Sequence, residues 1–200
     1  MENVVTNDQP EWLSRALKGD QEAFSLLVET YQRPVYNLCY RMLGDPAEAE
    51  DAAQETFWRA YQHGSRFDPA RPFMTWLLSI AAHYCIDQQR KKRMPQFSID
   101  LVVEEMLPDT APGPEKVASQ KEESQVLFAV LSRMKPEDRA VIVFRYWYQM
   151  SEDEIAHVLS TTVSSVKSRL HRARLMIAQQ YQVPSAISAN GGKNYEPLPL

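Results

Sequence analysis

Cysteine, glycine and long apolar runs are all scarce in this chain of 200 residues. The two cysteines, Cys39 and Cys85, lie within apolar helical patterns, and no further residues complete the spacing of a zinc site. We therefore expect buried thiols rather than a disulfide. There is no run of about eighteen apolar residues, so no membrane insertion is expected. The N-terminal segment lacks the basic-then-apolar pattern of a secretion signal, which predicts a cytoplasmic protein.

The residue sets that catalysis requires are also missing. The sequence contains no recognisable nucleophile–base set, no glycine-rich phosphate loop and no metal-ligand spacing. The H-x-E and C-x-x-C pattern of zinc deaminases, which act on flipped bases, is absent as well. We therefore expect a protein that is not an enzyme and that needs no cofactor.

Charge is distributed in alternating blocks, although the net charge is only −4. Residues 20–59 hold eight acids and three bases, and residues 98–123 hold seven acids and two bases. Between them, residues 66–93 hold six bases and two acids. Such asymmetry indicates that different surfaces bind different partners.

Residues 151–181 carry the pattern of a helix-turn-helix. Ser151 with Glu154 forms a capping box that predicts the start of a short helix. A turn is expected at residues 160–162, where Thr162 can cap a second helix. Apolar residues at spacings of three and four give that second helix one buried side: Val163, Val166, Leu170, Ala173, Ile177 and Tyr181.

The opposite side of this second helix is polar and basic. From Val163 to Tyr181 there are four Lys or Arg residues and no Asp or Glu. Such a helix fits the major groove of DNA, where its side chains reach phosphates and base edges. The alternative is a solvated basic face on a structural helix. The expected DNA-facing residues are Ser164, Ser165, Lys167, Ser168, His171 and Arg172.

An acidic stripe is expected on a helix that starts at Asp45-Pro46. Small and apolar residues of this helix can face inward: Ala49, Ala52, Ala53, Thr56, Phe57 and Ala60. Glu48, Asp51 and Glu55 then stack outward, where like charges repel by roughly 0.2–0.5 kcal/mol per pair. The stripe is either a solvated face or a docking surface for a basic or polar partner helix, and spacing leaves both open.

Residues 73–93 are expected to form another helix, which combines aromatic and basic side chains. Its expected core stripe is Phe73, Trp76, Leu77, Ile80, Ala81 and Tyr84. Four bases, from Arg90 to Arg93, close it and exceed what helix capping needs. Charge beside exposed rings is how proteins bind single-stranded nucleic acid, whereas the alternative is that the rings are simply core.

We predict an all-α chain of two small helical domains joined by a flexible linker, with a helix-turn-helix in the C-terminal domain. The expected boundaries are an N-terminal extension 1–18, a first domain 19–94, an acidic proline-containing linker 95–123, a second domain 124–182 and a disordered tail 183–200.

This order of segments resembles the extracytoplasmic-function (ECF) type of bacterial sigma factor in the sigma-70 family. Residues 40–61 resemble the segment that binds the RNA polymerase core, residues 73–93 the segment that reads the minus-ten element, and residues 164–174 the helix that reads the minus-thirty-five element. The resemblance implies a subunit that directs the polymerase core to promoter DNA and helps to melt it. It also implies an anti-sigma factor as a regulatory partner.

The resemblance assigns three sets of residues. Core binding falls to Glu48, Asp51, Gln54, Glu55 and Trp58; minus-ten binding to Phe67, Trp76, Ser79, His83, Arg90 and Lys91; minus-thirty-five binding to the six polar residues of the last helix given above. Ser79 and His83 depart from the Arg and Asn that many relatives carry, which affects base preference. The alternative function is an autonomous helix-turn-helix regulator, which would need neither the acidic stripe nor a melting helix.

Overall fold

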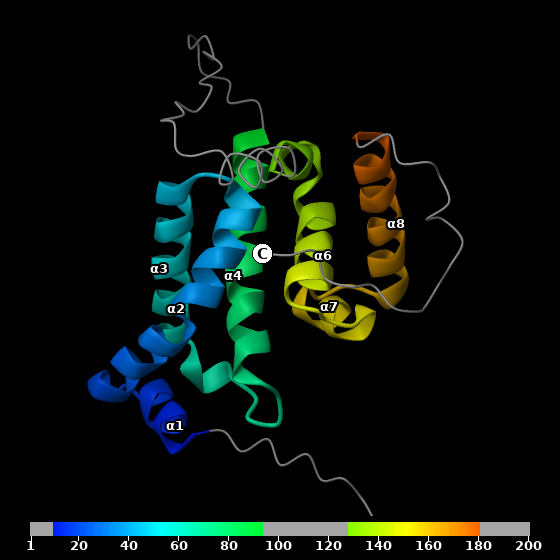
Figure 1. Ribbon diagram of the computed structural model, residues 1–200. Coiled ribbons are helices and arrows are strands. Elements are labelled where there is room, and N and C mark those ends of the chain that lie inside the picture. The colour runs from blue at the N-terminus through cyan, green and yellow to red at the C-terminus, as the bar shows by residue number, and fades with distance from the viewer. Residues whose placement is uncertain (1–9, 94–127, 181–200) are drawn as a thin grey trace, which may run out of the picture.

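A computed structural model describes residues 10–93 and 128–180, and every regular element within these ranges is a helix (Figure 1). In chain order the elements are α1 (Glu11–Leu17), α2 (Gln21–Leu43), α3 (Pro46–Gln62), the 3-10 helix η1 (Gly64–Arg66), α4 (Phe73–Arg93), α6 (Pro136–Trp147), α7 (Glu152–Val158) and α8 (Val163–Gln180). The prediction of an all-α chain with two small helical domains is confirmed. The predicted linker 95–123 and tail 183–200 lie outside the described residues.

Local side chains set the ends of the N-terminal helices. The carboxylate of Asp20 accepts a hydrogen bond from the backbone N–H of Ala23 at 3.1 Å and so starts α2. Gly44 ends α2 with a φ of 85°, a left-handed conformation that glycine adopts without strain. Asp45 then accepts from the N–H of Glu48 at 2.9 Å and starts α3, with Pro46 as its first residue.

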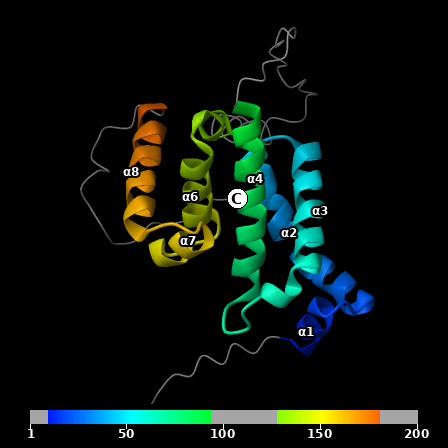
Figure 2. The ribbon, with the colours of Figure 1, turned by 180° about the vertical axis from the view of Figure 1, so that it is seen from behind.

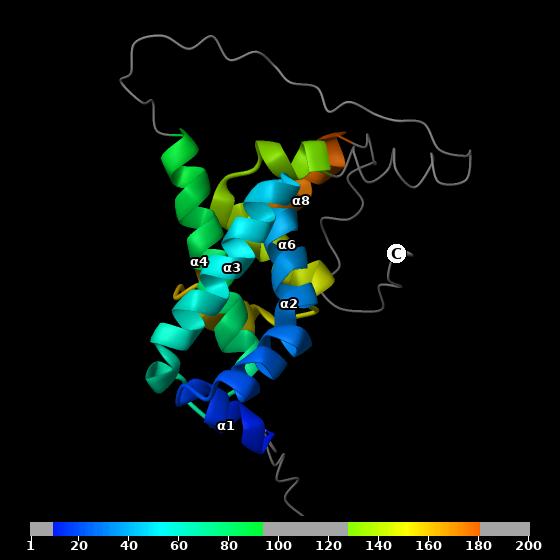
Figure 3. The same cartoon turned by 90° about the vertical axis from the view of Figure 1, so that its left-hand side faces the viewer.

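The N-terminal domain is built on α2, α3 and α4, which pack side by side, with α1 against the end farthest from the C-terminus of α4 (Figure 3). The six residues predicted to face inward on α3 are all buried. Four of the six are alanines, so the backbone of α3 lies close to its neighbours.

The buried side of α4 differs from the predicted stripe. Phe73, Leu77 and Ala81 are buried as expected, whereas Trp76, Ile80 and Tyr84 are only partly buried. The residues that complete the buried side are Leu78, Ala82, Cys85, Ile86 and Gln89. The reason is that α4 packs against α6 and α7 as well as α2 and α3, so it is covered from two directions. The spacing of apolar residues within 73–93 could not show that α6 and α7 pack on a second side of this helix.

The C-terminal helices α6, α7 and α8 form the predicted helix-turn-helix domain. Ser151 and Glu154 make the complete capping box of α7. The turn contains Ser160, whose φ is 50°, and Thr162 Oγ1 accepts from the N–H of Ser165 at 3.2 Å at the start of α8. Val166, Leu170 and Ala173 are buried as predicted, and Val163 and Ile177 are partly buried.

The two domains lie in contact with each other. Figures 1 and 2 show α6 beside α4, with α8 on the far side of α6 and α3 at the opposite edge of the molecule. The phenol of Tyr148 donates to the backbone oxygen of Pro34 at 2.6 Å, and Nε of Arg139 donates to the oxygen of Arg41 at 2.6 Å. Arg139 is 3% exposed, and burial lowers its pKa to about 10.

Candidate nucleic-acid and protein interfaces

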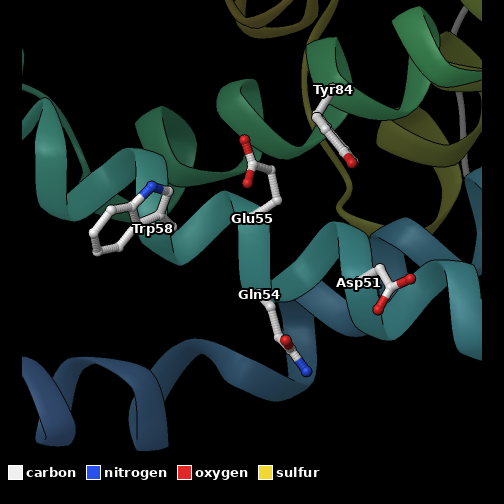
Figure 4. A pocket seen from close by; sticks show the side chains of 5 residues that line it. All are labelled: Asp51, Gln54, Glu55, Trp58 and Tyr84. Atoms are coloured by element: carbon white, nitrogen blue, oxygen red, sulfur yellow. The ribbon is translucent and has the colours of Figure 1, made fainter.

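The acidic stripe lies on the outer side of α3. Asp51, Gln54, Glu55 and Trp58 line an open hollow that Tyr84 of α4 completes (Figure 4). Figure 4 shows Glu55 directed toward α4 and Gln54 directed away from it. Every predicted core-binding residue therefore lies at the surface of α3, and the hollow brings four of the five together. Glu48, three residues before Asp51, does not line the hollow and contacts Lys92.

Cations of the same chain partly neutralise this surface. Glu55 Oε1 accepts from Nε of Arg59 at 2.7 Å, and the Arg59 guanidinium lies 4.9 Å from the centroid of the Tyr84 ring. Trp58, in contrast, is 55% exposed and stacks on the exposed ring of Tyr61 at 6.2 Å. Large exposed aromatic side chains beside carboxylates are typical of protein-binding surfaces.

A groove of about 540 Å³ continues from this surface between α3, η1 and α4. Three of the predicted minus-ten residues, Trp76, Ser79 and His83, line it, and Glu55 and Trp58 lie at its other wall. Phe67 lies beside it in a cluster of rings, with its centroid 5.4 Å from that of Trp76 and 5.3 Å from that of Phe73. The groove also contains residues that the sequence interpretation did not select: Arg59, Gln62, His63, Arg66 and Ile80. Arg66 is the first residue of the basic block 66–93, and that position was the sequence signal that could have identified it.

Hydrogen bonds within α4 fix Ser79 and His83, the two residues for which the sequence predicts a changed base preference. The hydroxyl of Ser79 donates to the backbone oxygen of Trp76 at 2.7 Å, and Nδ1 of His83 donates to the backbone oxygen of Ser79 at 2.7 Å. Because a carbonyl only accepts, Nδ1 carries the proton of this hydrogen bond, and in that tautomer Nε2 is the acceptor of the ring. His83 thus offers the groove a defined acceptor.

Three of the four basic residues at the C-terminal end of α4 contact other parts of the chain. Nε of Arg90 donates to Oε1 of Glu137 on α6 at 2.8 Å, and Arg93 donates to the backbone oxygens of Met134 and Ser132. Lys92 contacts Glu48, whereas Lys91 is exposed. The two predicted minus-ten cations are therefore in different states, since Arg90 is held by α6 and Lys91 faces solvent. They also lie apart from the groove.

The outer side of α8 carries the predicted minus-thirty-five residues. Ser164, Lys167, Ser168 and His171 are exposed, and Ser165 is partly exposed. Arg172 is turned toward α6, where its Nη2 donates to Oδ1 of Asp138 at 2.8 Å and its Nε donates to Oδ2 at 3.2 Å. This hydrogen bond raises the pKa of Arg172 above its ordinary value. Asp138 is 34 residues away in sequence, so spacing within the helix could not reveal the pair.

Within the described parts of the chain, no helix is both long and apolar enough to cross a bilayer. Two family descriptions match the sequence. Sigma-70 region 2 matches residues 27–94, and Sigma-70, region 4 matches residues 124–177. Together they cover the helices that carry all three candidate surfaces.

Proteins of known identity resemble the chain over most of its length. It is 37% identical to the ECF RNA polymerase sigma factor SigW of Bacillus subtilis over 84% of this chain and 94% of SigW. It is 31% identical to the ECF RNA polymerase sigma-E factor of Escherichia coli K12 over 85% of this chain and 92% of that protein.

Two solved structures share the fold. CnrH in complex with the cytosolic domain of CnrY aligns with a TM-score of 0.62 at 25% identity, covering 87% of this chain and 97% of that one. The sigma factor RpoE of Bartonella quintana, solved with the anti-sigma factor NepR, aligns with a TM-score of 0.64 at 20% identity, covering 82% of this chain and 99% of that one. The chain therefore belongs to the sigma-70 family of RNA polymerase sigma factors, in its extracytoplasmic-function group.

Proposed function

We propose that this sigma factor directs the polymerase core to promoters through three surfaces with separate tasks. The acidic side of α3 binds the core, the groove between α3 and α4 holds the melted minus-ten strand, and the outer side of α8 reads the minus-thirty-five duplex. Residues 19–94 and 124–182 form the two working units, and residues 95–123 pass through the polymerase between them. The protein acts in the cytoplasm and catalyses no reaction of its own.

The observation that carries this proposal is the continuity of the first two surfaces. Glu55 and Trp58 line both the hollow on α3 and the groove that reaches Trp76, Ser79 and His83. A core subunit bound to α3 would therefore lie directly against the strand in the groove. Rings for stacking and cations for phosphates, here Trp76 and Arg66, are what an unpaired strand requires.

Contacts in such a groove must offset the free-energy cost of flipping a base out of a melted promoter. Extruding a base costs a few kcal/mol, and stacking on an aromatic side chain returns about 1–3 kcal/mol per base. A groove of about 540 Å³ accommodates a base with room for the adjoining sugar. An autonomous DNA-binding regulator has no use for this arrangement, so the groove favours the sigma-factor function over that alternative.

We also propose an anti-sigma factor as a partner. In its solved structure, CnrH is bound to the cytosolic domain of CnrY. The exposed apolar side chains of α3 and α8, namely Trp58, Tyr61, Leu175 and Met176, offer contact area to such a protein.

Transcription in vitro tests the proposal. Purified core polymerase is given a library of random promoter sequences with and without the full chain, and the transcripts are sequenced. We expect the chain to select a set of promoters that share two elements, one upstream and one at the melted region. A transcript population unchanged by the chain would contradict the proposal.

A further inference from the structure

A buried carboxylate of the C-terminal domain holds one cation of α8 in a fixed direction. Asp138, in the first turn of α6, accepts from Arg172 with both of its oxygens: Nη2 donates to Oδ1 at 2.8 Å and Nε donates to Oδ2 at 3.2 Å. The Asp138 side chain is 10% exposed, whereas that of Arg172 is 54% exposed. The fold of the domain therefore fixes the acid, and about half of the arginine side chain remains open to solvent.

The other cations of α8 have different surroundings. Lys167 is 64% exposed and makes a loose contact of 3.7 Å with an acid of α7. Arg174 donates from Nε to the hydroxyl of Tyr146, and Arg169 is partly buried. Of the four cations, Arg172 is the one that a two-point contact holds, among the residues that the structure describes.

The contact between Asp138 and Arg172 leaves the far end of the guanidinium open. This group carries five N–H donors, and the carboxylate takes one from Nε and one from Nη2. The remaining N–H of Nη2 lies beside the N–H groups of Nη1 at the end of the planar fork. Guanine presents N7 and O6 as adjacent acceptors in the major groove, and an arginine fork binds both. Arg172 can therefore hold Asp138 and a guanine at the same time.

The carboxylate also determines which group of DNA the arginine suits. Asp138 offsets the positive charge of Arg172, so the pair gains little from neutralising a phosphate. The edge of a guanine carries no net charge, and its recognition depends on the direction of two hydrogen bonds. A side chain that is held in one direction before binding also loses less conformational entropy on binding. Both arguments favour base reading over phosphate contact.

We propose that Asp138 is a positioning residue that makes Arg172 a reader of one guanine in the upstream promoter element. Asp138 does not touch the DNA. It holds Nε and Nη2 and thereby directs the open end of the fork at N7 and O6 of the base. This role rests on the proposed function, because it assumes that α8 lies in the major groove of the minus-thirty-five duplex.

A double-mutant cycle in transcription tests this role. Core polymerase with the full chain transcribes promoters that carry each base pair in turn at each position of the upstream element. Discrimination is the ratio of output between the preferred base and the next best one. We expect guanine to be preferred at one position, and Arg172→Ala to reduce discrimination there about tenfold.

The variant Asp138→Asn completes the cycle. Its amide nitrogen cannot accept a hydrogen bond, so one of the two contacts with Arg172 is lost and discrimination should fall about threefold. In the Arg172→Ala background the same change should cause no further loss, because Asp138 acts through the arginine. Asp153→Asn, the same charge change at an exposed position in the first turn of α7, is the matched control and should keep the wild-type discrimination.

Circular dichroism checks that each variant is folded, and Asp138→Ser takes the place of Asp138→Asn if the latter loses helix content. Unchanged discrimination in the Asp138 variant, or an equal effect with and without Arg172, would overturn the proposal. Higher output from every promoter would overturn it as well, since Asp138 would then compete with DNA for the arginine. A preferred base other than guanine at the affected position would also contradict it. Failure of the proposed function would show separately, as absence of promoter-directed transcription by the wild-type chain.

Discussion

At the scale of single residues, neighbouring groups determine which hydrogen-bonding atoms remain available on each proposed DNA-binding side chain. Arg172 has two of its donor nitrogens committed to Asp138, which fixes the direction of its guanidinium. Arg174 donates from Nε to the hydroxyl of Tyr146 at 3.1 Å, so it contacts the neighbouring helix. His83 has a single defined acceptor. The residue types were visible in the sequence, but the contacts of Arg172 and Arg174 depend on partners from another helix, α6.

Replacing Arg172 should separate base reading from general attraction. Arg172 retains Nη1 for a guanine in the major groove, so Arg172→Ala should cost roughly 1–3 kcal/mol on the cognate upstream element and relax preference at one base position. Arg174→Ala should weaken all promoters alike or destabilise the domain. Both variants are tested by transcription from single-base variants of the upstream element. A uniform loss for Arg172→Ala would show that Arg172 contacts phosphate or serves only the fold.

His83 should favour a base that donates. Its Nε2 acceptor matches the exocyclic amino group of adenine or cytosine and not the carbonyl of thymine. We expect His83→Leu to reduce discrimination at one position of the melted element by about tenfold while leaving the upstream element unaffected. Transcription from single-base variants of the downstream element measures this. Unchanged discrimination at every position would exclude His83 from base reading.

At the scale of elements, the helix ends and the exposed sides of α3 and α8 followed from the sequence because they depend on local chemistry. Capping by Ser151, Asp45 and Thr162 was recognisable from residues three positions apart. The orientation of α4 did not follow, because α6 covers a side that helical spacing left open. The predicted lining of the groove was also incomplete, because Gln62 and His63 reach it from the end of α3 and not from α4.

The capping box of α7 should be worth about 1 kcal/mol to the helix-turn-helix. Ser151→Ala removes the hydroxyl that accepts from the N–H of Glu154 at 3.2 Å, and such a loss costs about 0.5–2 kcal/mol. Ser25→Ala, an exposed serine within α2 whose hydroxyl donates to Gln21, is the matched control and should change stability little. Urea unfolding of the full chain, followed by circular dichroism, measures both. Equal midpoints would mean that the box does not stabilise α7.

The same box gives the protein a defined response to acid. Glu154 accepts from the backbone N–H and the hydroxyl of Ser151, which holds the pKa of its carboxyl below the ordinary value. The stabilisation is therefore present above the unfolded-state pKa, near 4.3, and is lost as pH falls through the folded pKa. Glu154→Gln should flatten the dependence of unfolding free energy on pH below about 5. A pH profile parallel to that of the wild type would contradict this.

At the scale of the whole molecule, three surfaces lie on one connected helical body. The sequence predicted two domains from the proline-containing acidic segment between them, but not their contact, because nothing in the sequence around Glu137, Arg139 and Tyr148 indicates a partner. Their partners Arg90, Arg41 and Pro34 lie far away in sequence. Polar contacts between distant segments leave no periodic pattern.

Reversing the charge of α3 should abolish binding to the polymerase core while sparing the fold. Asp51 is exposed, and the Glu55–Arg59 pair is half exposed, so such a pair contributes at most about 1 kcal/mol. Asp51→Arg with Glu55→Arg should therefore retain its helical circular dichroism and fail to compete for core in a pull-down. Glu50→Arg with Glu29→Arg, two exposed positions off the stripe, is the control. Normal competition by the first variant would place the docking surface elsewhere.

The central claim is that this chain recognises promoters as part of the polymerase and not by itself. The most direct measurement is the affinity for one duplex promoter, selected by the transcription library, with and without core polymerase at fixed salt. The net charge of −4 and the acidic segment 98–123 repel phosphates, so the free chain should bind weakly and without sequence preference. With core, binding should become tight and specific. Nanomolar, sequence-specific binding by the free chain would contradict the account and identify an autonomous regulator.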